Sequence, residues 1–234
     1  MPHRLWILDT ARTMALLGMV LFHFTYDLEM FGLLAPGTAS GGFFWYHARA
    51  VAGSFLALAG VSLWLAHGQG IRWPGFWRRW LKLAAAAALV SLATRLAMPE
   101  VWVFFGILHA IALFSLIGLA FLRLPAVVTL ALGLGIILAS PHLAQALQWN
   151  TAALRFLGLG TLPSYTVDFE PVFPWFGPFL LGLGLARLAE PLRPALARLT
   201  GPGWLAWPGR HSLAIYLLHQ PLLIGLLQLW LIVT

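Results

Sequence analysis

Long apolar runs recur along this chain and limit what it can fold into. Several reach about 18 residues or more, and a helix of roughly 20 apolar residues crosses the roughly 30 Å hydrocarbon layer of a bilayer. With 61% hydrophobic and 9% charged residues, the chain has too few polar side chains to cover a globular surface, since soluble domains carry about 25% charged residues. A soluble enzyme and an intrinsically disordered protein are therefore excluded.

The runs predict an all-α fold, a polytopic transmembrane helical bundle of about seven spans. Turn-forming and charged residues separate the runs. The predicted spans cover approximately residues 11–34, 43–66, 80–97, 101–122, 126–147, 171–188 and 211–234. Because the spans and short loops use nearly the whole length, we expect a single transmembrane domain over residues 1–234 and no second domain.

Basic residues are distributed unevenly among the predicted loops, and cytoplasmic loops of membrane proteins carry an excess of Lys and Arg. This uneven distribution predicts a cytoplasmic N-terminus. The net charge of +7 then reflects the basic residues of cytoplasmic loops, so we expect no nucleic-acid partner. Arg155 falls in an outer loop. The basic residues on the predicted cytoplasmic side are Arg4, Arg72, Arg78, Arg79, Lys82, Arg123, Arg187, Arg193, Arg198 and Arg210.

The first predicted span carries ionisable side chains at Asp9, Arg12, His23 and Asp27. At about 100° per residue they fall within roughly 60° of one another, on one helix face. Each costs several kcal/mol inside a membrane, so such residues normally face the bundle interior. A histidine and a carboxylate four residues apart suit a general base with its orienting acid, although structural pairing and a proton relay fit the same spacing.

Polar residues also occur in the other predicted spans. The last span carries Ser212, Tyr216, His219 and Gln220 within about 100° of helix surface, followed by the kink-forming Pro221. Ordered by predicted depth, the chain has a cytoplasmic group (Asp9, Arg12, Arg210 and His211), a central group (His23, His109 and His219) and an outer group (Asp27, His47 and Asp168). Such a polar path would serve a reaction that moves a group across the membrane. His109 stands alone in its span, which is typical of a hydrogen-bonded core residue.

Five segments in order resemble the bacterial branch of the heparan-α-glucosaminide N-acetyltransferase catalytic-domain family. They are residues 4–15, 19–28, 105–109, 167–177 and 209–221, so the resemblance covers essentially the whole chain. Thr13 stands where the family usually has glycine. The resemblance implies an integral-membrane acyltransferase that takes an acyl group from cytoplasmic acyl-CoA, and acetyl is the acyl group that we expect. It further implies a sugar or glycan acceptor at the outer side.

The polar residues and this resemblance together predict the site. We expect His23, Asp27, His109 and His219 to be the catalytic candidates, with His23 as the general base and Asp27 accepting its N–H. We expect the cytoplasmic arginines to hold the phosphates of acetyl-CoA or another acyl-CoA. The predicted CoA-binding residues are Asp9, Arg12, Arg210, His211, Tyr216 and Gln220, and the predicted acceptor-binding residues are His47, Asp168 and Trp175.

Other functions fit parts of the same pattern. Histidines on different spans could ligate a haem in a redox protein, and a stripe of His and Asp could serve a proton-coupled transporter. The chain has no cysteine, which excludes thiolate metal sites, and we expect no metal. The remaining expectations are a bacterial cytoplasmic (inner) membrane location, contact with membrane lipid and, as an open alternative, a homo-oligomer.

Overall fold

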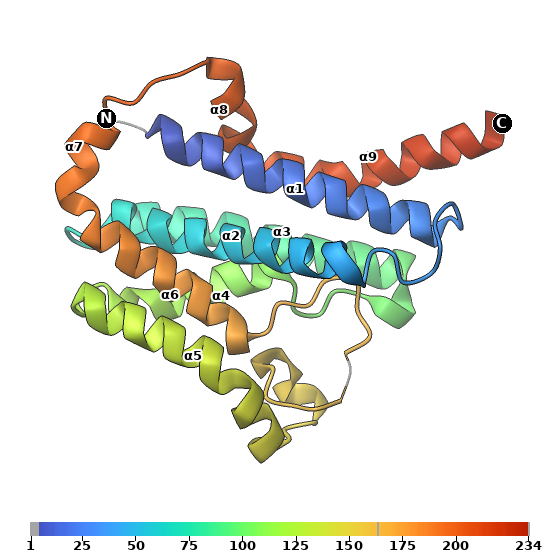
Figure 1. Ribbon diagram of the computed structural model, residues 1–234, viewed down its shortest axis with the longest axis horizontal. Helices are drawn as coiled ribbons and strands as arrows, with labels where there is room; N and C mark the ends of the chain where they lie inside the picture. Colours follow the sequence, from blue (N-terminus) through green and yellow to red (C-terminus); the bar gives the residue numbers. More distant parts are fainter. Residues whose placement is uncertain (1–4, 163, 234) are drawn as a thin grey trace. The chain divides into compact units, whose positions relative to one another are not determined.

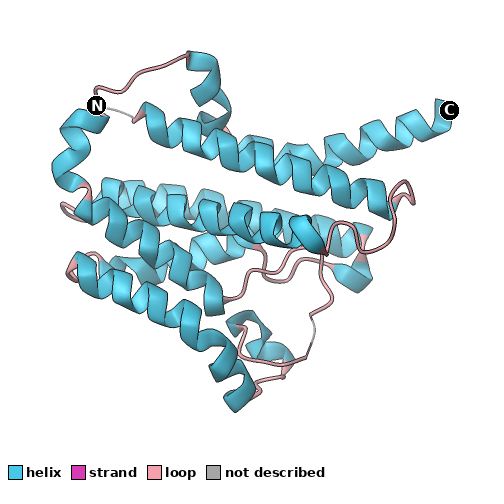
Figure 2. Ribbon diagram, viewed as in Figure 1, coloured by secondary structure: helices cyan, strands magenta, loops and turns pink. Residues whose placement is uncertain are grey.

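The computed structural model of the protein describes residues 5–162 and 164–233, and these residues are mostly helical, with no strand among them (Figure 2). Arg4 lies outside the described residues. The α-helices are α1 Trp6–Met30, α2 Gly42–His67, α3 Trp73–Ala97, α4 Ile107–Phe121, α5 Ala126–Leu147, α6 Val172–Leu188, α7 Arg193–Leu196, α8 Gly203–Arg210 and α9 Ser212–Val233. Short 3-10 helices are η1 Pro99–Val101, η2 Ala152–Leu157 and η3 Glu190–Leu192.

The predicted all-α, polytopic membrane architecture is confirmed. Among the described residues, 5 helices are long and apolar enough to cross a membrane, namely α1, α2, α3, α5 and α9. The pair formed by α6 and the segment Glu190–Leu196, bent by 55°, raises the number to 6 if it is one span. The remaining predicted span corresponds to α4, a shorter apolar helix. Length and composition alone therefore support five to six spans and do not confirm the predicted number of about seven.

Two predicted spans begin earlier than hydropathy indicated. Helix α1 begins at Trp6 rather than near residue 11, and α3 begins at Trp73 rather than near residue 80. In α1 the extra turn contains Asp9, which is 0% exposed, so a prediction from apolarity alone begins the helix too late. In α3 the extra turns contain basic and tryptophan residues, and Pro74 lies in the first turn, where its missing N–H costs nothing.

The fourth predicted span is only partly helical. Helix α4 begins at Ile107, whereas the prediction began near residue 101. The intervening segment pairs with a loop far along the chain, since Val167 N donates to Val101 O at 3.0 Å and Glu170 N to Phe105 O at 3.1 Å. These long-range bonds pair the carbonyl groups of Val101 and Phe105, so the segment satisfies part of its backbone outside an α-helix.

The region between residues 188 and 211, predicted as a basic loop, contains helices. Helix α8 packs against α1, and just before α8 the Trp6 indole N–H donates to Pro202 O at 3.2 Å. Arg210, one of the basic residues of this region, lies in the last turn of α8.

The chain forms two compact units, Met1–Phe55 with Leu192–Thr234 and Leu56–Pro191. In the first unit α1 lies beside both α8 and α9, and α9 (red) runs in the same direction as α1 (blue) in Figure 1. The first half of α2 also packs on α1, because a Cβ on Gly18 would lie 2.7 Å from Val51 Cγ2. In the second unit α5 packs along α6, and α3 along α4.

Glycines let two helices of the second unit approach closely. A Cβ on Gly182 of α6 would lie 2.0 Å from Ala57 O of α2, and a Cβ on Gly60 of α2 would lie 2.0 Å from Phe179 O. Small residues at such crossings allow helix backbones to pack without intervening side chains. Phe114 and Phe179, in the aromatic core of this unit, are 0% exposed.

Gly182→Ala is expected to lower the free energy of unfolding by about 1–3 kcal/mol, because the added methyl overpacks this crossing. Gly135→Ala in α5 is the matched control, since a Cβ there meets no atom within 4 Å. The measurement is thermal unfolding of both variants in detergent. Equal melting temperatures for the two variants would contradict a close α2–α6 crossing.

Candidate active site

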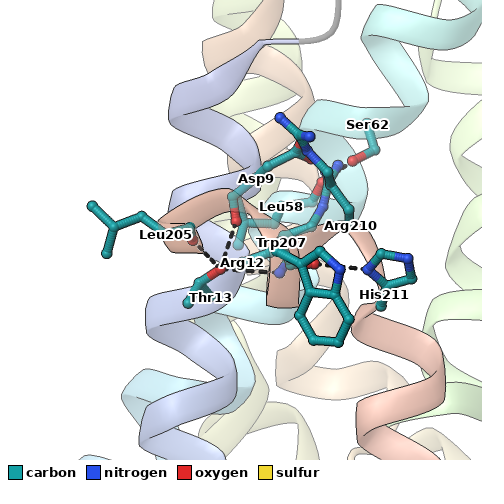
Figure 3. A network of polar contacts seen from close by, with 10 residues as sticks. Asp9, Arg12, Thr13, Leu58, Ser62, Leu205, Trp207, Arg210 and His211 are labelled. Atoms are coloured by element: carbon teal, nitrogen blue, oxygen red, sulfur yellow. Dashed lines mark hydrogen bonds and ion pairs between the residues drawn. The ribbon is translucent and has the colours of Figure 1, made fainter. Parts of the chain in front are cut away.

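A carboxylate paired with two arginines lies at the N-terminal end of α1 (Figure 3). Asp9 Oδ1 lies 2.8 Å from Arg12 Nη1, and Asp9 Oδ2 lies 3.3 Å from Arg210 Nε. The Asp9 side chain is 1% exposed, while those of Arg12 and Arg210 are 23% and 42% exposed. The buried carboxylate therefore holds two partly exposed guanidinium groups from α1 and α8 beside each other.

Thr13 joins the same two helices, one turn along α1 from Asp9. Its hydroxyl donates to Leu205 O at 2.6 Å and accepts from the Gly209 N–H at 3.0 Å. A Cβ on Gly209 would lie 1.8 Å from Asp9 O, so only glycine permits this contact. Sequence reasoning missed Thr13 and Gly209 as site-forming residues, although the pair Gly209–Arg210 at a helix end was a usable signal.

His211 lies at the edge of this cluster, at the end of α8. Its Nδ1 lies 2.9 Å from Trp207 O, and the two rings lie 4.6 Å apart (Figure 3). Because a carbonyl oxygen only accepts, Nδ1 carries the proton in this contact. The predicted cytoplasmic residues Asp9, Arg12, Arg210 and His211 are thus brought together in one unit.

Two histidines meet further along α1 and α9. The rings of His23 and His219 lie 4.8 Å apart at an interplanar angle of 62°. His219 Nδ1 lies 2.6 Å from Tyr216 O, so Nδ1 is the protonated nitrogen and Nε2 of the neutral ring carries a lone pair. His219 Nε2 is buried and has no hydrogen-bond partner among the described residues. This nitrogen has the protonation state that a general base requires.

Asp27 contacts a different residue from the one that the sequence predicted. We expected its carboxylate to accept an N–H from His23, but Asp27 Oδ1 accepts from Gln220 Nε2 at 2.6 Å. Asp27 is 0% exposed, and within the described part of the chain its Oδ2 has no hydrogen-bond partner. The spacing of His23 and Asp27 placed both on one face but could not specify which residues of α9 lie opposite.

The polar residues of α1 contact those of α8 and α9 in the same order along the chain. Asp9 pairs with Arg210, His23 lies against His219, and Asp27 binds Gln220. From Asp9 to Asp27 this line extends about 27 Å at 1.5 Å per residue. The polar stripe predicted on the first span therefore faces α8 and α9 along most of its length.

His47, predicted to bind acceptor, packs α2 against α1. Its Nε2 lies 2.8 Å from Gly18 O, and its ring stacks on Phe43 with centroids 5.5 Å apart. Since Nε2 must donate to the carbonyl, this histidine holds two helices of the first unit together.

His109 lies in the second unit and uses both ring nitrogens. Nδ1 accepts from the Gly106 N–H at 3.3 Å, which leaves the proton on Nε2, 3.1 Å from Ser91 Oγ. Ser91 in turn donates to Val103 O at 2.6 Å. This arrangement makes His109 a structural link between α3 and the start of α4, in contrast to His219.

Asp168 also stabilises the start of α4. Its Oδ2 accepts from the Ile107 N–H at 3.0 Å, and a Cβ on Gly106 would lie 2.1 Å from the same oxygen. A carboxylate at this position compensates the unpaired N–H groups and the positive dipole of a helix N-terminus. Trp175 lies half-buried near the start of α6. The predicted outer residues thus fall into both units.

The described part of the chain contains no group of three or more His, Asp or Glu side chains that could hold a metal ion. The direct ring contact of His23 with His219 leaves no space between them for an iron and its porphyrin. A haem ligated by this pair is therefore not supported.

These features define an all-helical, multi-pass membrane protein with buried histidines and carboxylates. The family model described as heparan-alpha-glucosaminide N-acetyltransferase, catalytic, matches residues 4–221, and the chain belongs to this family of membrane transferases. The predicted membership of the family is thereby confirmed. No curated protein and no solved structure matches the chain. The family match favours acetyl transfer and gives no support to proton-coupled transport.

Proposed function

We propose that the protein is an acyl-CoA-dependent acyltransferase that moves an acetyl or other acyl group from the cytoplasmic side to a sugar or glycan at the outer side. The observation that carries this proposal is the ordered polar line on α1, α8 and α9. It begins with two partly exposed arginines and continues to a histidine that carries an available lone pair.

The arginines supply the chemistry needed to bind the phosphates of CoA. A guanidinium group carries five N–H donors and binds phosphate in a bidentate manner. Asp9 occupies some of the donors of Arg12 and Arg210 but leaves both groups partly exposed. His211 and Tyr216 remain proposed neighbours of the bound donor, whereas Gln220 donates to Asp27 at the other end of the polar line.

The central histidines lie about 16 Å along α1 from Arg12, at 1.5 Å per residue over the segment to His23. That distance is similar to the reach of a pantetheine arm, so a CoA held at Arg12 would present its thioester near His23 and His219. We propose that His219 Nε2 takes the proton of the acceptor as it attacks the thioester carbonyl. The imidazolium then protonates the departing CoA thiolate. His23 supports the His219 ring by its edge-to-face contact.

The direction of the helices supports the proposed topology. Since α1 and α9 run in the same direction, a chain in which both cross the membrane makes an odd number of crossings. Seven crossings result if α4 and α6 each cross, which agrees with the predicted spans. The Lys and Arg distribution then favours a cytoplasmic N-terminus in a bacterial inner membrane. Because the family match extends across both units, we propose that they form one domain, alone or as a homo-oligomer in lipid.

Arg12→Ala is expected to raise the Kd for acetyl-CoA about 10- to 100-fold, because a charge-assisted hydrogen bond contributes about 1.5–3 kcal/mol. The fold should persist, since Asp9 keeps its contact with Arg210. The measurement is isothermal titration calorimetry on the purified full chain. Arg155→Ala, an exposed arginine of η2 in the predicted outer loop, is the control. Equal affinity of both variants for acetyl-CoA would exclude Arg12 from phosphate binding.

A further inference from the structure

Three buried hydrogen-bond acceptors lie where α1 packs on α9. Asp27 Oδ2, His219 Nε2 and Gln220 Oε1 each have no hydrogen-bond partner among the described residues. Asp27 is 0% and His219 9% exposed. Native proteins pair nearly all buried polar side-chain atoms, and exceptions occur at functional sites. Asp27 contacts Gln220 directly, and His219 packs on His23, which lies one turn before Asp27 on α1.

The existing hydrogen bonds determine that all three atoms are acceptors. The Nδ1–H of His219 donates to Tyr216 O, so Nε2 has only a lone pair to offer. The amide of Gln220 must direct its NH₂ group to the Asp27 carboxylate, which leaves Oε1 as the unpaired atom. The second carboxylate oxygen of Asp27 accepts as well. A cluster of this kind requires a ligand that brings hydrogen-bond donors.

We infer that Asp27, His219 and Gln220 form the subsite for the acyl acceptor and that it selects groups with several O–H or N–H donors. The inference rests on the proposed function for the identity of the ligand as acceptor. Sugar hydroxyls and amines share the required chemistry, whereas ethers and esters lack donors. Asp27 and Gln220 position the acceptor, and His219 Nε2 faces the O–H or N–H that reacts.

The reaction balances at this subsite. The reacting O–H or N–H bond breaks and its proton passes to His219 Nε2, while the freed electron pair forms a bond to the acyl carbon. The C–S bond of the thioester then breaks, and the thiolate receives the proton from the imidazolium. Asp27 and Gln220 act here as positioning residues, because they bind the acceptor without exchanging a proton with it.

The test measures acceptor binding in the absence of acyl-CoA. Saturation-transfer NMR is recorded on the detergent-purified full chain with methyl β-D-glucopyranoside, its 2-amino-2-deoxy analogue and its per-O-methylated ether. Binding of the first or second probe and not of the ether is expected. A stronger signal from the second probe indicates an amine acceptor, and a stronger signal from the first a hydroxyl acceptor.

Two variants identify the residues involved. Asp27→Leu/Gln220→Met removes both partners of one hydrogen bond, which proteins tolerate better than the loss of one partner. Asp27→Asn keeps the bond to Gln220 and converts one acceptor into a donor. Each is expected to weaken binding of the preferred probe about 10- to 100-fold. Gln228→Met, on an exposed position of α9, is the matched control and should bind like the unmodified protein.

Wild-type affinity in either folded variant, or equal binding of the ether, would overturn the inference. If the double variant fails to fold, Asp27→Asn decides alone. Because acceptor binding is measured without acyl-CoA, failure of this inference would leave the proposed use of acetyl-CoA as donor intact. That use is contradicted only if the protein does not bind acetyl-CoA.

Discussion

His219→Ala is expected to lower acetyl transfer about 10²- to 10⁴-fold, the usual effect of removing a general base. The reason is the protonation state of its ring, since the bond from Nδ1 to Tyr216 O leaves the lone pair on the buried Nε2. The Kd for acetyl-CoA should stay unchanged, because the arginines lie about three helical turns away. Single-turnover kinetics with labelled acetyl-CoA separates the chemical step from binding.

His109→Ala provides the comparison, because both ring nitrogens of His109 are hydrogen-bonded, one to Gly106 and one to Ser91. It should lower the unfolding free energy by about 1–3 kcal/mol, the cost of leaving buried polar partners unpaired, and retain transfer in the folded fraction. If His109→Ala abolishes transfer while His219→Ala retains it, the base lies in the other unit. If His23→Ala alone abolishes transfer, His23 is the base, as the sequence predicted.

Asp9→Ala is expected to lower the free energy of unfolding by about 3 kcal/mol, at the lower end of the range for breaking a buried ion pair. The variant leaves Arg12 and Arg210 adjacent without their shared counter-ion. The lower end applies because Arg210 is 42% exposed and water screens part of the repulsion. Thermal unfolding in detergent measures the effect.

Glu100→Ala is the control for Asp9→Ala, because Glu100 is an exposed carboxylate in η1. It should unfold like the unmodified protein. A melting temperature of Asp9→Ala equal to that of Glu100→Ala would mean that the Asp9 cluster does not hold α8 against α1.

The sequence predicted most of the helices because their apolar runs are long and end at turn residues. Helix α5 agrees with its predicted bounds at both ends, since Pro125 precedes it and no charged side chain interrupts it. The start of α4 was missed because residues 101–106 are apolar but bond to a distant loop. Hydropathy reports the tendency to leave water and carries no information about such long-range backbone bonds.

The site was predictable in its residue types and less so in its contacts. The polar face of α1 followed from helical periodicity, and the structure places it against α8 and α9. The partner of Asp27 did not follow, because Gln220 meets it only through the packing of two helices remote in sequence. The difference between His109 and His219 likewise depends on which atoms surround each ring, a tertiary property that spacing does not encode.

The central claim is that this chain uses acyl-CoA as its acyl donor. The most direct test incubates the detergent-purified full chain with acetyl-labelled acetyl-CoA and the acceptor probe that binds best. The proposed function predicts that free CoA appears together with labelled probe in equal amounts, and that His219→Ala slows both at least about 10²-fold. Acetyl-CoA that is neither bound nor consumed by the folded protein would contradict it.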